Sequence, residues 1–199
     1  VNGQLVNCTI TALEQNTASD QVVLATPPVK KDFINLQQDQ LDQTTALLIL
    51  AGPTDEHPFT YDDFEKIIDK FIAFCTQNQL KGLITNSRRT PNLDRYFQKT
   101  KIPENIQLHL VQTKNALSLV QLIKQATYIF VTEDSTSMLA ETIQSGRFIC
   151  SIYNSKSILE PLNQKYLQHK LMQRQNLAAD FQHPDCKNTQ ALDLTRPIV

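Results

Sequence analysis

The chain has 199 residues, of which 41% are hydrophobic and 20% are charged, a composition typical of a globular protein that can bury a substantial core. Its formal net charge is −1, with no block of like charge, which argues against nucleic-acid binding. No apolar stretch approaches the roughly 18 residues of a membrane-spanning helix, and no signal peptide is visible. We therefore expect a cytoplasmic protein.

The four cysteines are scattered and form no CxxC pair; they are Cys8, Cys75, Cys150 and Cys186. We expect free thiols in a reducing compartment and no metal site.

Residues 1–26 are rich in strand-forming residues, and Pro27-Pro28 then interrupts any regular element. The chain also begins with Val1 instead of Met. We interpret residues 1–44 as the tail of a preceding domain followed by a linker.

From residue 45 onward, apolar strand patterns alternate with amphipathic helix patterns. Strands are expected near residues 46–51, 81–85, 106–111, 127–132 and 148–152. This alternation predicts an α/β, Rossmann-like, doubly wound domain over residues 45–175 with a mostly parallel sheet in the order 3-2-1-4-5. Residues 176–199 are polar, and we expect a C-terminal extension that packs loosely, back across the domain.

Several residues are expected to begin or end the helices. Thr60 can cap the helix "TYDDFEKIIDKFIAFCTQ", and Thr90-Pro91 can open a short one. Gly146 can end the helix "STSMLAETIQ". Ser157 and Glu160 have the spacing of a capping box that opens the helix "ILEPLNQKYLQHKLMQ".

Folds of this class bind ligands at the carboxyl ends of their strands, so three loops are candidates. The first is "AGPTDEHP", residues 51–58. Gly52 would let a ligand approach the backbone, and His57 could act as an acid or base. The alternatives are a plain turn and a solvated histidine.

The second loop is "TNSRRTP", residues 85–91. Arg88 and Arg89 supply guanidinium groups, and Ser87 and Thr90 supply hydroxyls, beside an expected helix N-terminus. This combination indicates an anion site that suits phosphate; the alternative is a solvated basic turn.

The third is "VTEDSTSMLAETIQSG", residues 131–146. Ser135, Thr136 and Ser137 could cap the helix or bind a phosphate at its N-terminus. Glu141 lies one turn further on the same face and could accept ribose hydroxyls; the alternative is a surface carboxylate. Glu133 and Asp134 could hold a metal, but adjacent acids before a helix more often favour its dipole.

The motifs "LILAGP", "TNSRRTP" and "VTEDSTSMLAETIQSG" together resemble the mitochondrial-fission ELM family, and the last one also resembles the nucleotide-binding half of GT-B glycosyltransferases. The resemblance covers residues 45–155 best. The positions that match are Gly52, Pro53, Ser87, Arg88, Arg89, Asp134, Ser135, Ser137 and Glu141. Ala51, Thr54 and Phe148 depart from the family pattern.

The resemblance implies a GT-B C-terminal-type domain that binds a nucleotide sugar through its diphosphate, without metal or cofactor. A lipid-linked or membrane-surface acceptor would then place the protein at the periphery of a membrane. A glycosyltransferase of this kind would depend on a preceding acceptor domain for full activity. Two alternatives remain open: a GT-B-type epimerase using His57 and Glu133, and a non-catalytic scaffold.

Overall fold

The computed structural model describes Leu36 and residues 44–185. The strand-like segments expected before residue 27, together with Cys8 and Cys186, lie outside the described residues. The elements are β1 (Thr45–Leu50), α2 (Tyr61–Gln77), β2 (Lys81–Asn86), α3 (Asp94–Lys99), β3 (Ile106–His109), α4 (Leu119–Gln125), β4 (Tyr128–Thr132), α5 (Thr136–Gln144), β5 (Phe148–Tyr153), α6 (Pro161–Gln168) and β6 (Gln173–Asn176).

The six strands form one sheet in the order β3-β2-β1-β4-β5-β6, and every neighbouring pair is parallel. The expected five strands and their order are confirmed, with boundaries that agree within two residues. β1 lies inside the sheet and all six of its residues are buried, which explains its continuous apolar sequence.

The sixth strand was not predicted. Residues up to 173 were assigned to a helix, but α6 ends at Gln168, and Gln173–Asn176 pairs with β5 instead. All four residues of β6 are polar and half-buried, so they carry neither an apolar run nor an alternating pattern. The predicted domain boundary between residues 175 and 176 falls inside this strand.

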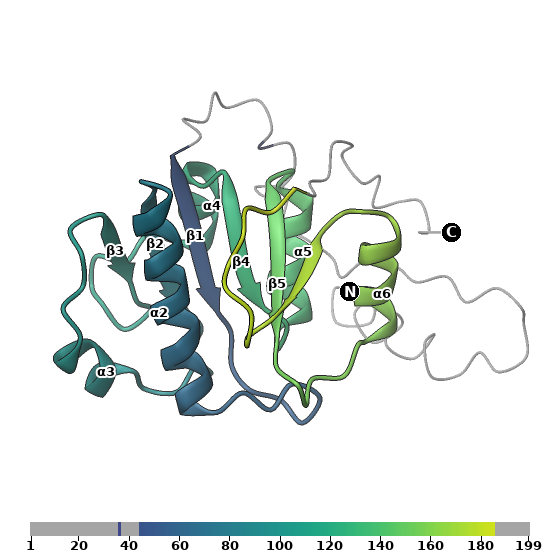
Figure 1. Ribbon diagram of the computed structural model, residues 1–199, viewed down its shortest axis with the longest axis horizontal. Coiled ribbons are helices and arrows are strands. Elements are labelled where there is room, and N and C mark those ends of the chain that lie inside the picture. The colour runs from purple at the N-terminus through teal and green to yellow at the C-terminus, as the bar shows by residue number, and fades with distance from the viewer. Residues whose placement is uncertain (1–35, 37–43, 186–199) are drawn as a thin grey trace, which may run out of the picture.

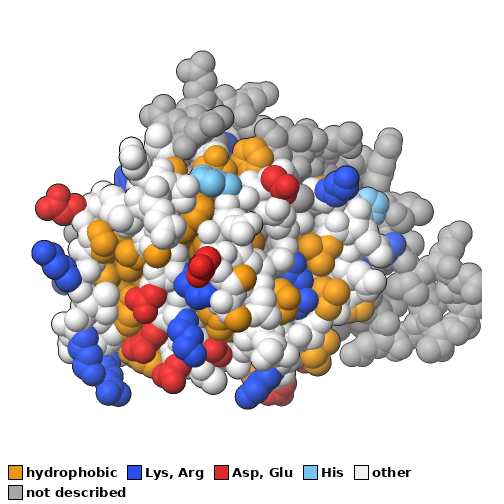
Figure 2. All heavy atoms as spheres, viewed as in Figure 1, with side chains coloured by type: hydrophobic (Ala, Val, Ile, Leu, Met, Phe, Trp, Pro, Cys, Tyr) orange, Lys and Arg blue, Asp and Glu red, His pale blue; other side chains and the backbone are white. Residues whose placement is uncertain are grey.

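Helices cover both faces of the sheet (Figure 1). Ala46, Leu48 and Leu50 of β1 pack in one cluster with α2 and α3, whereas Leu47 and Ile49 pack in another with α4, α5 and α6. This division follows from the two-residue period of a strand. Acidic and basic side chains are interspersed over the α2 face (Figure 2), so that face carries no extended basic patch.

Two of the expected helix ends are confirmed. Thr60 accepts a hydrogen bond from the Asp63 amide, and the Asp63 carboxylate accepts one from the Thr60 amide, so α2 has a capping box. Gly146 follows α5 with a φ of 72°, the left-handed conformation that favours glycine after a helix.

Two expected helix starts were wrong. The helix expected at Thr90-Pro91 begins at Asp94, and the Thr90 hydroxyl donates to the Leu50 carbonyl at the end of β1. The Ser157–Glu160 capping box does not form. Ser157 exchanges hydrogen bonds with Asn154, and α6 begins at Pro161 without a side-chain cap.

The described part of the C-terminal extension packs against the α2 face of the sheet. Leu177 and Phe181 belong to the same core cluster as α2, and the Phe181 ring stacks on Phe130 at a centroid distance of 4.9 Å. The Lys70 ammonium donates to the carbonyls of Ala178 and Ala179. Up to residue 185 the extension therefore packs back across the domain, and the buried Leu177 and Phe181 attach it more firmly than the loose packing expected.

Cys75 and Cys150 are buried and lie outside any disulfide, as expected. Over residues 44–185, no helix is both long and apolar enough to cross a bilayer.

Candidate functional site

The chain reverses its direction across the sheet between β1 and β4, and the loops that follow these strands meet at this point. The Ala51 amide donates to the Thr132 hydroxyl at 2.8 Å, which joins the two strand ends directly. The loop after β2 lies alongside, because the Ser87 amide donates to the Leu50 carbonyl at 2.8 Å. All three candidate loops therefore lie at one edge of the sheet, where parallel folds bind their ligands.

Ser87 and Thr90 hold the arginine loop in place. Both are buried. The Thr90 hydroxyl accepts from the Ser87 amide at 2.9 Å and lies 2.8 Å from the Leu50 carbonyl, while the Ser87 hydroxyl accepts from the Arg89 amide at 3.1 Å. The hydroxyls expected to bind phosphate are thus engaged within the protein, and they fix the backbone that carries the two arginines.

Gly52 is required by this same loop. A Cβ atom at Gly52 would lie 2.2 Å from the Arg89 Cβ and 2.6 Å from its backbone carbon, far inside contact distance. A neighbouring segment of the protein therefore fills the space that was expected to admit a ligand. The glycine lets the arginine loop pack directly onto the end of β1.

A cavity of about 550 Å³ opens beside these loops. Five predicted site residues line it: Ser87, Arg88, Arg89, Ser135 and Ser137. The other six do not: Gly52, Pro53, Thr90, Asp134, Thr136 and Glu141. Glu141 is half-buried one turn further into α5, so its contact with a ribose stays a prediction. The cavity is large enough for a nucleotide-sized ligand.

Sequence reasoning missed the third wall of the cavity, which comes from the segment between β3 and α4 and includes Val111, Ala116, Leu117 and Ser118. The Asn86 side chain on β2 anchors that segment by accepting a hydrogen bond from the Val111 amide at 2.9 Å. β3 ends at the same end of the sheet, but the loop that follows it carries no charged motif that would mark it in the sequence. Val111, Ala116 and Leu117 add an apolar surface to a cavity that the arginine loop and the start of α5 line mainly with polar side chains.

The N-terminus of α5 has no side-chain cap. Ser135 occupies the N-cap position without a side-chain bond to the first turn, and its hydroxyl lies 3.4 Å from that of Ser137. Helix N-termini carry partial positive charge and unpaired N–H groups. Arg89 is directed here, since its Nη2 donates to the Asp134 carbonyl at 3.0 Å. The helix end and the arginine loop thus present positive groups to one cavity, an arrangement suited to an anion.

Asp134 precedes this helix with a buried carboxyl group, and neither of its oxygens has a hydrogen-bond partner among the described residues. Burial raises the pKa of Asp134 from 3.8 to about 6. The nearby Thr132 hydroxyl, the residue's own backbone amide, and the charges of His57 and Arg89 partly offset this rise, although the hydroxyl does not reach hydrogen-bonding geometry.

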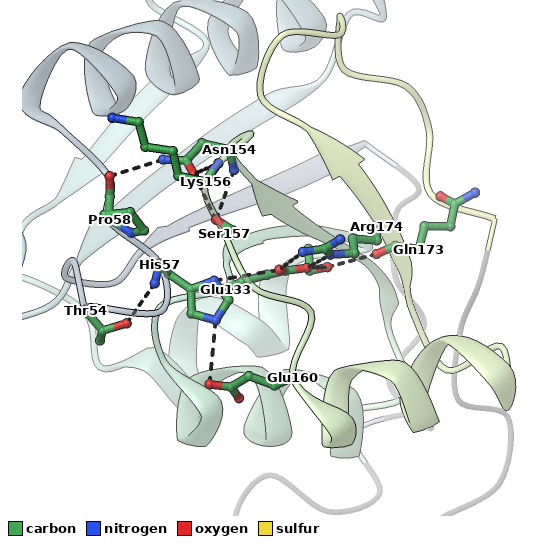
Figure 3. Close-up of polar contacts among 11 residues, drawn as sticks. Thr54, His57, Pro58, Glu133, Asn154, Lys156, Ser157, Glu160, Gln173 and Arg174 are labelled. Carbon is green, nitrogen blue, oxygen red and sulfur yellow. Dashed lines mark hydrogen bonds and ion pairs between the residues drawn. The ribbon is translucent and has the colours of Figure 1, made fainter.

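Glu133 and His57 are buried and lie in one cluster with the half-buried Arg174 (Figure 3). Arg174 on β6 donates from Nε to Oε1 at 2.7 Å and from Nη2 to Oε2 at 2.9 Å. The His57 ring lies between two carboxylates, 3.9 Å from Glu133 and 3.7 Å from Glu160. Among residues 44–185, no group of three or more His, Cys, Asp or Glu side chains is arranged to hold a metal ion.

The solved structures with a similar fold include glycosyltransferases. The structure is similar to Acinetobacter baumannii MurG with a TM-score of 0.49 at 13% identity, over 81% of this chain and 44% of that one. It is similar to glycosyltransferase VinC in complex with DTDP, with a TM-score of 0.43 at 11% identity, over 80% of this chain and 35% of that one. A glycotransferase of kitacinnamycin gives a TM-score of 0.43 at 12% identity, over 74% and 34%. The chain thus spans less than half the length of each.

No curated protein matches the sequence. The family model described as "Mitochondrial fission ELM1" matches residues 11–198, a range that includes all three motifs and every element of the sheet. The chain therefore belongs to the mitochondrial fission ELM1 family.

Proposed function

We propose that this chain binds a nucleoside-diphosphate sugar and forms the donor-binding part of a GT-B-like, metal-independent glycosyltransferase. The observation that supports this most directly is the cavity of about 550 Å³, which is lined together by Arg88, Arg89 and the uncapped N-terminus of α5. A diphosphate would lie against the helix end and the arginines, and the nucleoside would lie against the wall formed by Val111 and Leu117.

In such a reaction the chain stabilises charge. Negative charge develops on the diphosphate as the bond to the sugar breaks, and donors already aimed at that position lower the barrier. Arg88 is exposed and lines the cavity, so we assign it to the diphosphate. Arg89 contributes charge while one of its amino groups holds the Asp134 carbonyl. The acceptor, which we expect to be lipid-linked or at a membrane surface, would bind elsewhere.

The epimerase alternative has less support, because its acid and base would be His57 and Glu133. Both Glu133 oxygens already accept hydrogen bonds from Arg174, and neither residue lines the cavity.

The proposal is tested by thermal unfolding in the presence of UDP, GDP, ADP or TDP. A ligand at a hundred times its Kd stabilises the folded state by about 2.7 kcal/mol, which for a domain of this size raises the Tm by roughly 5–10 °C. We expect one of these diphosphates to raise the Tm of the parent by this amount. The same diphosphate should raise the Tm of Arg88→Ala by less. Arg95→Ala is the matched control, because Arg95 is an exposed residue of α3 that does not line the cavity. Stabilisation by none of the four would contradict nucleotide binding and favour the scaffold alternative.

A further inference from the structure

A buried ion pair connects the last strand of the sheet to the residues just before α5. Glu133 follows β4 and its side chain is 0% exposed, while the Arg174 side chain on β6 is 16% exposed. Nε and Nη2 of Arg174 donate to the two carboxylate oxygens of Glu133 at 2.7 and 2.9 Å. Only arginine provides this paired geometry. The Ser151 hydroxyl donates to the same carboxylate at 2.7 Å.

This pair is poorly explained by stability alone. Two charges lose their hydration on burial, and well-packed apolar residues of the same size often stabilise a fold as much or more. Here the guanidinium carbon also lies 3.8 Å from the centre of the Tyr153 ring, so Arg174 is held from two sides. What the pair does supply is a fixed position for Glu133.

Glu133 is joined to the cavity through the backbone that follows it. Its amide donates to the Ile152 carbonyl at 3.1 Å, which fixes the strand end to β5. The next carbonyl, that of Asp134, accepts from Arg89 at 3.0 Å, and the next residue, Ser135, lines the cavity as the N-cap of α5. The three residues before the helix are therefore held by Arg174 on one side and by Arg89 on the other.

We propose that Arg174 is a positioning residue for the diphosphate site. Through Glu133 it fixes the N-terminus of α5 in the orientation that the diphosphate requires, although Arg174 does not itself line the cavity that holds Arg88 and Arg89. The inference rests on the proposed function, and it predicts that ligand affinity depends on the Arg174–Glu133 geometry independently of the overall stability of the fold.

The first variant is Arg174→Lys, which keeps the charge and loses the paired hydrogen bonds. The second is the double variant Glu133→Met/Arg174→Met, which removes both charges and leaves Ser151 with the Gln173 carbonyl, 3.3 Å away, as an acceptor. The control is Lys70→Met, which removes contacts between α2 and the C-terminal segment at a distance from the cavity. For each protein, urea unfolding gives the stability, and calorimetric titration gives the affinity for the diphosphate that stabilises the parent.

We expect both site variants to bind the diphosphate about tenfold to a hundredfold more weakly than the parent, as displaced binding groups typically do, whatever their stability. Lys70→Met should retain its affinity even where it unfolds at lower urea concentration. Affinity that instead follows stability across all four proteins, or a parent-like affinity of Arg174→Lys, would overturn the inference and leave the pair a structural contact.

Hydrogen exchange separates this inference from the proposed function. In the protein without ligand, the amides of residues 133–138 should exchange faster in Arg174→Lys than in the parent, while those of α2 should not. If the parent binds no diphosphate, the proposed function fails; unchanged exchange at residues 133–138 would then show that the positioning inference fails as well.

Discussion

Replacing Asp134 with asparagine should change how the stability of the protein depends on pH. Burial raises the pKa of the Asp134 carboxyl from 3.8 to about 6, and the nearby Thr132 hydroxyl, the residue's own amide, His57 and Arg89 offset only part of this rise. The folded protein therefore holds this proton more tightly than the unfolded chain does. Stability falls as the pH rises from about 4 to about 6 and does not return above that range, because the folded state then holds a buried carboxylate.

The size of the effect follows from the pKa difference. About two pKa units separate the folded and unfolded states, and each unit corresponds to about 1.4 kcal/mol, which gives an upper bound of about 3 kcal/mol. Asparagine has nearly the same shape and does not ionise. Any fixed cost of burying its amide cancels when one protein is compared with itself at two pH values. We expect the stability of Asp134→Asn relative to the parent to rise by about 2 kcal/mol between pH 4 and pH 8.

The assay is urea unfolding of parent and variant at several pH values, with Asp55→Asn as a control for the loss of one charge, since Asp55 is exposed in the loop after β1. Carbon-13 NMR titration of the Asp134 carboxyl in the parent measures its pKa directly. Parallel pH profiles for the parent and Asp134→Asn, or a carboxyl that titrates near pH 4, would refute the reasoning.

Three further predictions concern the candidate site. Arg88→Ala should weaken diphosphate binding, and the loss measured by calorimetry should shrink as salt rises, because exposed charges are screened; a loss that is independent of salt would argue against a charge interaction. Gly52→Ala should displace Arg89, costing about 1–3 kcal/mol of stability together with ligand affinity, whereas Gly82→Ala, which meets only core side chains, should cost stability alone. Glu141→Gln should weaken nucleotide binding about tenfold or more with little effect on unfolding, and a 2′,3′-dideoxy nucleotide should lose little further affinity in this variant; additive losses would reject the ribose contact.

The architecture of the sheet could be predicted from the sequence alone. Each of the first five strands has its own apolar pattern, each is followed by a helix, and right-handed crossovers leave few ways to arrange such units. The sequence also predicted correctly that Thr60 caps the start of α2 and that Gly146 follows the end of α5. These are local signals, since they depend on the conformational preferences of residues within one turn or one strand.

The sixth strand depended on the tertiary structure. The residues Gln173–Asn176 carry no strand pattern, and they pair with β5 in a position where Arg174 reaches over β5 to Glu133 at the end of β4. At Ser157 a local sequence signal predicted a contact that the structure does not form. The spacing of Ser157 to Glu160 suited a capping box, but the Asn154 side chain, brought close by the turn after β5, is its partner.

Only part of the candidate site could be predicted from the sequence. The motifs identified the arginine loop and the start of α5, which do meet at one cavity. Only the packed structure decided which atoms face that cavity. The hydroxyl of Thr90 is directed to the end of β1, and Gly52 admits a neighbouring loop in place of a ligand. A motif specifies residue types along the chain, but a side chain's direction is set by the partners that satisfy its hydrogen bonds, and these come from segments distant in sequence.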